Sequence, residues 1–294
     1  MRRREFLGAG MAGAAGVLWT GSSAQAAPDD SGATALVPLG KHLKVCRIGA
    51  GTGMRGGNRQ TNQTRLGKEK FEALLQHEYD QGIRLFDCAD LYGTHPFVGR
   101  VLKGKPRESL QIVSKIWVNR GGLPEAERPL ADVSVKRFLK ELEMEYIDLL
   151  QIHCMTSAKW PEEQRAQMDS MAKLKEQGLI KAHGVSCHSL DALKAAAAEP
   201  WVDVIHVRIN PFNVCMDATK DEVLPVVKQA HAAGKGIVGM KINGEGKLTP
   251  EQLGESVKFA LGAGVVDALI AGFETTGQVD KFKALVRDAL AAGK

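Results

Sequence analysis

The chain has 294 residues, of which 44% are hydrophobic and 25% are charged, so it can form one large globular domain or two ordinary ones. Its formal net charge is only +5, and no basic stripe carries interleaved aromatic residues, which argues against a nucleic-acid-binding protein. Five cysteines without a CxxC pair argue against a zinc ribbon, an iron–sulfur cluster and a disulfide scaffold.

The first residues have the pattern of an export signal. Arg3-Arg4-Glu5-Phe6-Leu7 is followed by a short Gly/Ala-rich stretch and by Ala24-Gln25-Ala26, a small-x-small cleavage site. A twin arginine before Phe-Leu resembles the signal read by the twin-arginine translocation machinery. We therefore expect residues 1–26 to be removed on export to the periplasm; a Sec signal or a frayed N-terminus is the alternative. The apolar stretch is too short for a stable membrane span, so we expect no membrane insertion.

After a lead-in over residues 27–44, strand-like and helix-like segments alternate to the end of the chain. Near-continuous apolar runs predict strands at Val45–Gly51, Ile83–Ala89, Gln111–Trp117, Tyr146–His153, Lys181–His188, Val202–Asn210, Gly236–Ile242 and Ala268–Phe273. Apolar residues at helical spacing predict helices at Lys68–Gln81, Val133–Glu145, Glu162–Gln177, Leu190–Ala198, Glu222–Ala233, Glu251–Leu261 and Val279–Ala291.

Eight β/α units over about 250 residues match the length and period of an α/β protein with a (β/α)8 TIM barrel. A doubly wound sheet is the alternative, and it would need a break in strand order that a sequence does not reveal. No linker or change of composition divides residues 45–294, which we therefore interpret as a single domain. We expect the protein to be a monomer.

Reactive side chains stand at the predicted C-terminal ends of neighbouring strands, where a TIM barrel carries its chemistry. A buried Lys115 must be paired, and Asp87 on the adjacent strand can be its partner. A tyrosine beside that cation, such as Tyr92, would have a lowered pKa and could give a proton to a carbonyl oxygen. His153, from the next strand, could orient the same oxygen.

Each of these residues also has an ordinary structural interpretation. Asp87 could cap a turn, Tyr92 could pack in a loop, Lys115 could be a solvated strand end, and His153 could be a hydrogen-bonded structural residue. The placement of all four at three neighbouring strand ends favours a shared catalytic role.

Several ordered motifs resemble those of the aldo-keto reductase family. They are FDCADLYG at residues 86–93, the Ser114-Lys115 pair, LLQIH at 149–153, GVSCH at 184–188, RINPF at 208–212, MKINGEGKL at 240–248 and IAGFETTGQVDKF at 270–282. The resemblance runs from about Val45 to the C-terminus. It implies that Tyr92 is the proton donor, that Lys115 lowers the pKa of Tyr92, that Asp87 holds Lys115 and that His153 orients the substrate.

The resemblance also implies a cofactor, NADP with NAD as the alternative, extended across the barrel mouth. Its contacts would come from Gly51, Thr52, Ser186, Cys187, His206, Met240, Lys241, Asn243, Gly272 and Thr275. Met240 stands where the family usually has a stacking aromatic residue, and Ser186-Cys187 where it often has Ser-Asn. A basic residue for the 2′-phosphate is missing beside Glu274, so Lys241, Lys247 or Lys281 would supply that charge.

A metal site is conceivable but is not predicted. Cys88, Cys154 and Cys187 stand at strand ends, close in sequence to His153, His183 and His188. Small residues are expected at a crowded barrel mouth, and a free cysteine is commonly a small buried hydrophobe.

Three functions are compatible with the sequence. The first is a reductase of a small aldehyde, ketone or sugar-like carbonyl, with Trp117 and Asn119 lining the substrate pocket. The second is a Schiff-base aldolase or lyase that uses Lys115 or Lys241. The third is a reductase-like protein that binds ligands without turnover, because nicotinamide nucleotides are expected to be scarce outside the cytoplasm.

Overall fold

The computed structural model describes residues 32–293, which form a closed barrel of eight parallel strands in the order β10-β3-β4-β5-β6-β7-β8-β9. These strands are β3 (Ile48–Gly51), β4 (Leu85–Asp87), β5 (Gln111–Trp117), β6 (Ile147–Met155), β7 (Ile180–Cys187), β8 (Val204–Arg208), β9 (Gly236–Met240) and β10 (Ala268–Ala271). The closed order confirms the TIM barrel and excludes the doubly wound sheet.

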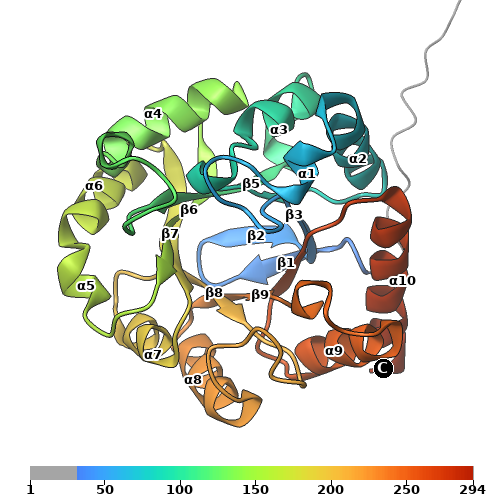
Figure 1. The fold of residues 1–294 in the computed structure, drawn as a ribbon. Helices are drawn as coiled ribbons and strands as arrows, with labels where there is room; N and C mark the ends of the chain where they lie inside the picture. Colours follow the sequence, from blue (N-terminus) through green and yellow to red (C-terminus); the bar gives the residue numbers. More distant parts are fainter. Residues whose placement is uncertain (1–31, 294) are drawn as a thin grey trace, which may run out of the picture.

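The helices form a ring around the barrel (Figure 1). They are α1 (Asn62–Arg65), α2 (Lys68–Asp80), α3 (His95–Leu102), α4 (Ala131–Leu142), α5 (Trp160–Glu163), α6 (Arg165–Glu176), α7 (Leu190–Ala198), α8 (Lys220–Ala232), α9 (Pro250–Gly262) and α10 (Thr276–Ala292). Short 3-10 turns lie at Asp90–Tyr92, Arg107–Ser109, Glu125–Glu127 and Gly244–Gly246. Within residues 32–293, no helix has the length and apolar character needed to cross a bilayer.

Helix α3 was not predicted from the sequence. It has eight residues, begins with His95-Pro96 and contains Gly99, so its helical signal is weak. Tertiary packing overrides that weakness, because Val98 and Leu102 are buried against the core. Gly99 is needed for the packing: a Cβ atom there would lie 2.7 Å from the carbonyl oxygen of Leu142 at the end of α4.

The predicted strand Val45–Gly51 was also wrong in part. Residues Leu36–Leu39 form β1, which pairs antiparallel with β2 at Leu43–Cys46, and the barrel itself begins only at Ile48. The hairpin lies across the centre of the barrel (Figure 1), where Leu39 and Val45 pack against inward-facing Leu85. The hairpin therefore closes the N-terminal end of the barrel and leaves the other end for a site.

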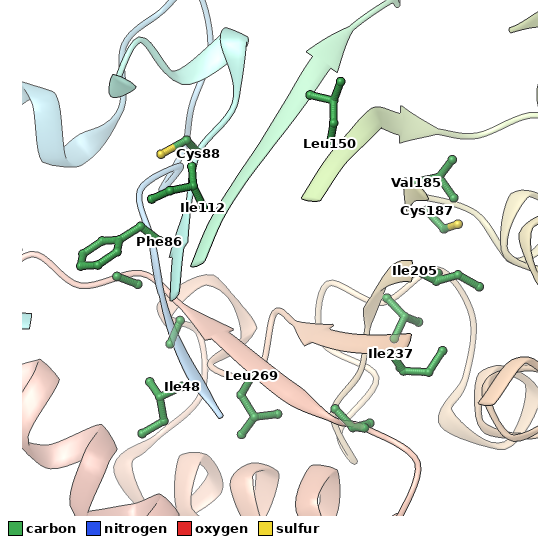
Figure 2. Packing of buried hydrophobic residues seen from close by; sticks show 14 of the residues in the cluster. Ile48, Phe86, Cys88, Ile112, Leu150, Val185, Cys187, Ile205, Ile237 and Leu269 are labelled. Carbon is green, nitrogen blue, oxygen red and sulfur yellow. The ribbon is translucent and has the colours of Figure 1, made fainter. Parts of the chain in front are cut away.

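Alternation along the strands separates the core from the site. Figure 2 shows outward-facing side chains such as Phe86, Ile112 and Leu150, which belong to the core between strands and helices. Leu85, which precedes Phe86, and Val113, which follows Ile112, belong instead to the cluster inside the barrel. Because successive side chains of a strand point to opposite faces, Asp87 and Lys115, two residues further on, point into the barrel nearer its C-terminal end.

Candidate active site

Asp87 and Lys115 form a buried ion pair inside the barrel. The Lys115 ammonium donates to Oδ1 of Asp87 at 2.6 Å and to the carbonyl oxygen of Cys88 at 3.0 Å. The side chain of Asp87 is 7% exposed and that of Lys115 is 2% exposed. Burial on its own raises the pKa of Asp87, but Lys115 and the ring of His206 outweigh that effect and hold the pKa at about 2. The pair predicted from the sequence is thus formed, and its Asp87 carboxyl is ionised.

Tyr92 ends the 3-10 turn Asp90–Tyr92, directly after β4. The turn is anchored by the buried carboxylate of Asp90, which pairs with Arg59 at 3.2 Å and with Arg137 at 2.8 Å. This anchoring places the Tyr92 ring 5.3 Å from the Lys115 Nζ and the hydroxyl 3.3 Å from Nε2 of His153. The sequence could not give these distances, because Tyr92 is in a loop.

The expected lowering of the Tyr92 pKa by Lys115 does not appear in this structure. Burial, and after it the negative charge of Asp87, raise the pKa of the Tyr92 phenol well above its ordinary value. The physical reason is that Lys115 is neutralised by Asp87, so the pair presents no net cation to the ring. Tyr92 is therefore protonated near neutral pH in this structure.

His153 completes the group from the end of β6. Burial, and after it the charge of Lys115, lower the pKa of His153 well below its usual range, so the ring is neutral. Its ring meets those of Tyr92 and Trp117 edge to face, with centroids 5.4 and 5.3 Å away. These contacts hold Nε2 beside the phenol, where it can share a hydrogen bond with Tyr92 or with an oxygen bound between the two.

An open cleft lies beside this group, and Asp87 and Tyr92 are part of its wall. Five of the predicted cofactor residues line it: Gly51, Met240, Lys241, Asn243 and Gly272. Sequence reasoning missed further wall residues, which are Gly53, Met54, Arg55, Glu245 and Ile270. Gly53 is two residues from the predicted Gly51, and Glu245 and Ile270 lie within the motifs at 240–248 and 270–282, whereas the exposed Arg55 gave no signal.

The other predicted cofactor residues do not line this cleft. Cys187 is a clear correction: it points away from the barrel interior, into the outer core beside Val185 (Figure 2). Alternation explains this, because Ser186 is the inward residue of that pair. Thr275 caps α10 by accepting from the backbone of Gln278, and it stands at the start of a helix outside the cleft wall.

Thr52, Ser186 and His206 are buried supports. Thr52 donates to the carbonyl oxygen of Asp87 at 2.9 Å, and Ser186 accepts from the backbone N–H of Cys154 at 2.8 Å. The Nε2 of His206 lies 3.4 Å from Oδ1 of Asp87, and because burial lowers the pKa of His206 the ring joins this buried group as a neutral imidazole. All three are buried, and none of them is in the wall of the cleft.

The two predicted substrate residues flank His153. Trp117 contacts the His153 ring and donates from its indole N–H to the carbonyl oxygen of Gly121 at 2.6 Å. Asn119 donates to the carbonyl oxygens of His153 and Cys154, at 3.3 and 3.1 Å. The Asn119 amide thus holds the end of β6, including the left-handed Cys154 at φ +66°.

The cysteines and histidines do not gather into a metal site. Cys88 and Cys187 both face the outer core in Figure 2, while Cys154 is half-buried at the barrel mouth. Over residues 32–293, no group of three His, Cys, Asp or Glu side chains is arranged to hold a metal ion.

Comparison with known proteins agrees with the motifs. The sequence model of the Aldo/keto reductase family matches residues 47–263. The aldo-keto reductase YhdN of Bacillus subtilis is 31% identical over 200 residues, which are 63% of this chain and 56% of YhdN. Aldo-keto reductase family 1 member A1 of Homo sapiens is 29% identical over 174 residues, 49% of this chain and 50% of that protein. The chain thus spans about half the length of the curated relatives it matches.

The fold extends the likeness over most of the chain. A solved structure of an aldo-keto reductase from Pseudomonas aeruginosa matches with a TM-score of 0.71 and 27% sequence identity. The match covers 87% of this chain and 96% of the chain in that structure.

Proposed function

Because this chain belongs to the aldo/keto reductase family, we propose that it is an NAD(P)H-dependent oxidoreductase with a small aldehyde, ketone or sugar-like carbonyl as substrate. Hydride would pass to or from the carbonyl carbon, with Tyr92 as the proton donor. The observation that supports this most is that Tyr92 and Asp87 lie in the wall of one open cleft, where Tyr92 contacts the neutral His153 ring and Asp87 pairs with Lys115.

The cleft suits a dinucleotide. Gly51, Gly53 and Gly272 in its wall present backbone without side chains, and any Cβ at these positions would overlap neighbouring atoms. Arg55 and Lys241 in the same wall are cations that could bind the pyrophosphate. Met240 could pack against the nicotinamide ring.

The bound nicotinamide would supply the hydride, and the chain would handle the proton. Tyr92 donates its O–H proton to the oxygen that gains negative charge as the carbonyl carbon is reduced. A raised pKa keeps the proton on Tyr92 until that charge appears, and an alkoxide is basic enough to take it. His153 donates or accepts at the same oxygen from Nε2, while the Asp87–Lys115 pair keeps the Tyr92 ring in place.

We propose NADP as the preferred form, with NAD as the alternative. Arg55 and Lys241 bring positive charge to the cleft wall, which favours the more negatively charged NADP. Glu245 opposes this preference, because its carboxylate lines the same wall and pairs with Lys241 at 2.6 Å.

Titration of the purified protein with NADPH and NADH, followed by fluorescence quenching, tests the proposal. We expect saturable binding, and loss of reduced-nicotinamide absorbance when a panel of small aldehydes and ketones is added. Tyr92→Phe should keep the cofactor affinity while turnover falls about 10²- to 10⁴-fold. Absence of binding for both nucleotides would refute the proposal.

The Schiff-base alternative receives no support from the geometry. A Schiff-base lysine must lose its proton, whereas the Lys115 ammonium donates to both Asp87 and a backbone carbonyl oxygen. Borohydride trapping with a carbonyl substrate would detect such an enzyme, and we expect no adduct.

Export through the twin-arginine route is a separate proposal, because residues 1–26 lie outside the described residues. It rests on Arg3-Arg4 and on the Ala24-Gln25-Ala26 cleavage pattern. Replacing both arginines with lysine should retain the protein inside the cytoplasm in a fractionation experiment, while a wild-type control is found in the periplasm.

A further inference from the structure

Two neighbouring loops at the barrel mouth are joined by hydrogen bonds from two side chains, the buried Asn210 and the half-buried Cys215. One loop, residues 209–219, connects β8 to α8, and the other, residues 241–249, connects β9 to α9. The second loop carries Lys241, Asn243 and Glu245, which line the cleft. Asn210 in the first loop is fully buried and contacts both loops.

All the hydrogen-bonding capacity of the Asn210 amide is used there. Its Oδ1 accepts from the backbone N–H groups of Phe212 and Val214, both at 3.1 Å. Its Nδ2 donates to the carbonyl oxygen of Val214 at 2.7 Å and to that of Lys241 at 3.2 Å. An amide side chain has two donors and two acceptor sites, so no group is left over.

The bond to Lys241 falls at a strained position. Lys241 has φ +59°, in the left-handed region that is unfavourable for a residue with a Cβ atom. Such a conformation persists only where neighbouring structure holds it. The loops also pack together, since a Cβ atom at Gly244 would lie 2.9 Å from Val214 Cγ1.

We propose that Asn210 is a positioning residue that fixes the Lys241 backbone, and with it the Met240–Lys241 edge of the cleft, for dinucleotide binding. The inference rests on the proposed function for the cofactor, but Asn210 itself is buried and absent from the cleft wall. Its effect must therefore pass through the loop of residues 241–249.

Asn210→Asp is the decisive variant, because it keeps the shape and the acceptor Oδ1 but replaces the Nδ2 donor with a charged oxygen facing two carbonyl oxygens. Asn210→Ser is a neutral companion: a serine hydroxyl can still serve the local turn, but it is too short to reach Lys241. Asn213→Asp is the matched control in the same loop, since the one bond of Asn213, from the N–H of Lys220 to its Oδ1, survives that change.

We expect the Kd for NADPH to rise about tenfold or more in both Asn210 variants, a change of about 1.4 kcal/mol. kcat at saturating NADPH should stay within about twofold, because the Tyr92 group is untouched. Without any cofactor, trypsin should cleave after Lys241 and Lys247 faster than in wild type and in Asn213→Asp. Circular dichroism checks that the variants fold. If Asn210→Asp does not fold, the Kd and the cleavage rate of Asn210→Ser decide the question.

Unchanged Kd and unchanged cleavage rates in a folded Asn210 variant would overturn the inference and leave the proposed function standing. Failure of wild type and Asn213→Asp to bind any dinucleotide would instead refute the proposed function. The cofactor-free cleavage rates would then still decide whether Asn210 positions the loop, and equal rates would overturn that too.

Discussion

Gly53 lies against the aromatic ring of Tyr92, so closely that a methyl group at residue 53 would overlap the ring carbons. The glycine is in the turn that follows β3, and the tyrosine is in the turn that follows β4. The loop glycine after one strand thereby sets the position of the phenol after the next strand, and with it the contact between Tyr92 and His153.

We predict that Gly53→Ala displaces the Tyr92 ring and lowers kcat at least tenfold, with the fold retained. The reason is steric, because the added Cβ must push the ring away from its 3.3 Å approach to His153. Steady-state kinetics measure the effect. Gly57→Ala is the matched control in the same loop, since a Cβ there would meet nothing within 4 Å, and equal kinetics of the two variants would contradict the prediction.

Asp87→Asn should destabilise the protein by about 3 kcal/mol, because it leaves the buried Lys115 ammonium without its counter-charge. Urea unfolding followed by circular dichroism gives the free energy of unfolding. For comparison, Glu143→Gln breaks the exposed Lys103–Glu143 pair, whose side chains are 69% and 48% exposed, and should change stability by less than about 1 kcal/mol. Similar losses in the two variants would show that burial of the pair does not matter.

Glu78→Gln should stabilise the protein in alkaline solution. Glu78 on α2 is buried, and its Oε2 has no hydrogen-bond partner among residues 32–293. Burial raises the pKa of Glu78 from 4.5 to about 8. The native state thus binds the proton more tightly than the unfolded chain, so the carboxyl's stabilising contribution is full below pH 4.5 and is lost as the pH rises to about 8.

The glutamine variant lacks this titration, so its advantage over wild type should grow across that window to about 2–4 kcal/mol. Urea unfolding of both proteins at a series of pH values measures the difference. A constant difference at every pH would contradict the raised pKa.

His183 should produce a pH dependence of the opposite sign. Burial lowers the pKa of His183 from 6.5 to about 4, with Asp203 opposing the shift. The unfolded chain therefore binds the proton first, so stability is full above pH 6.5 and falls as the pH drops to about 4. His183→Gln should reduce this loss of unfolding free energy between pH 6.5 and about 4 by up to about 3 kcal/mol.

The fluorescence of Trp201 reports the unfolding of this region, since its ring stacks on His183 with centroids 4.2 Å apart. If the free energy of unfolding falls equally with pH in wild type and His183→Gln, protonation of His183 is not coupled to unfolding.

Local pattern was sufficient for much of the architecture and for part of the site. Apolar runs separated by amphipathic segments predicted the barrel, because each buried parallel strand and each helix has its own period. Asp87, Lys115 and His153 could be placed at strand ends because the period of two fixes which face a residue takes. The same rule, applied one residue further, would have turned Cys187 away from the site.

Tertiary contacts decided the rest. The order and closure of the strands bring Asp87, Lys115 and His206 together from β4, β5 and β8, and no local signal encodes a contact across the barrel. The hairpin at the barrel floor and helix α3 exist because the core buries their apolar side chains, against weak local preference. The sequence by itself thus determined which groups could carry the chemistry. Burial and pairing, which are properties of the whole fold, determined their charge states, including a Tyr92 pKa that moves opposite to the expected direction.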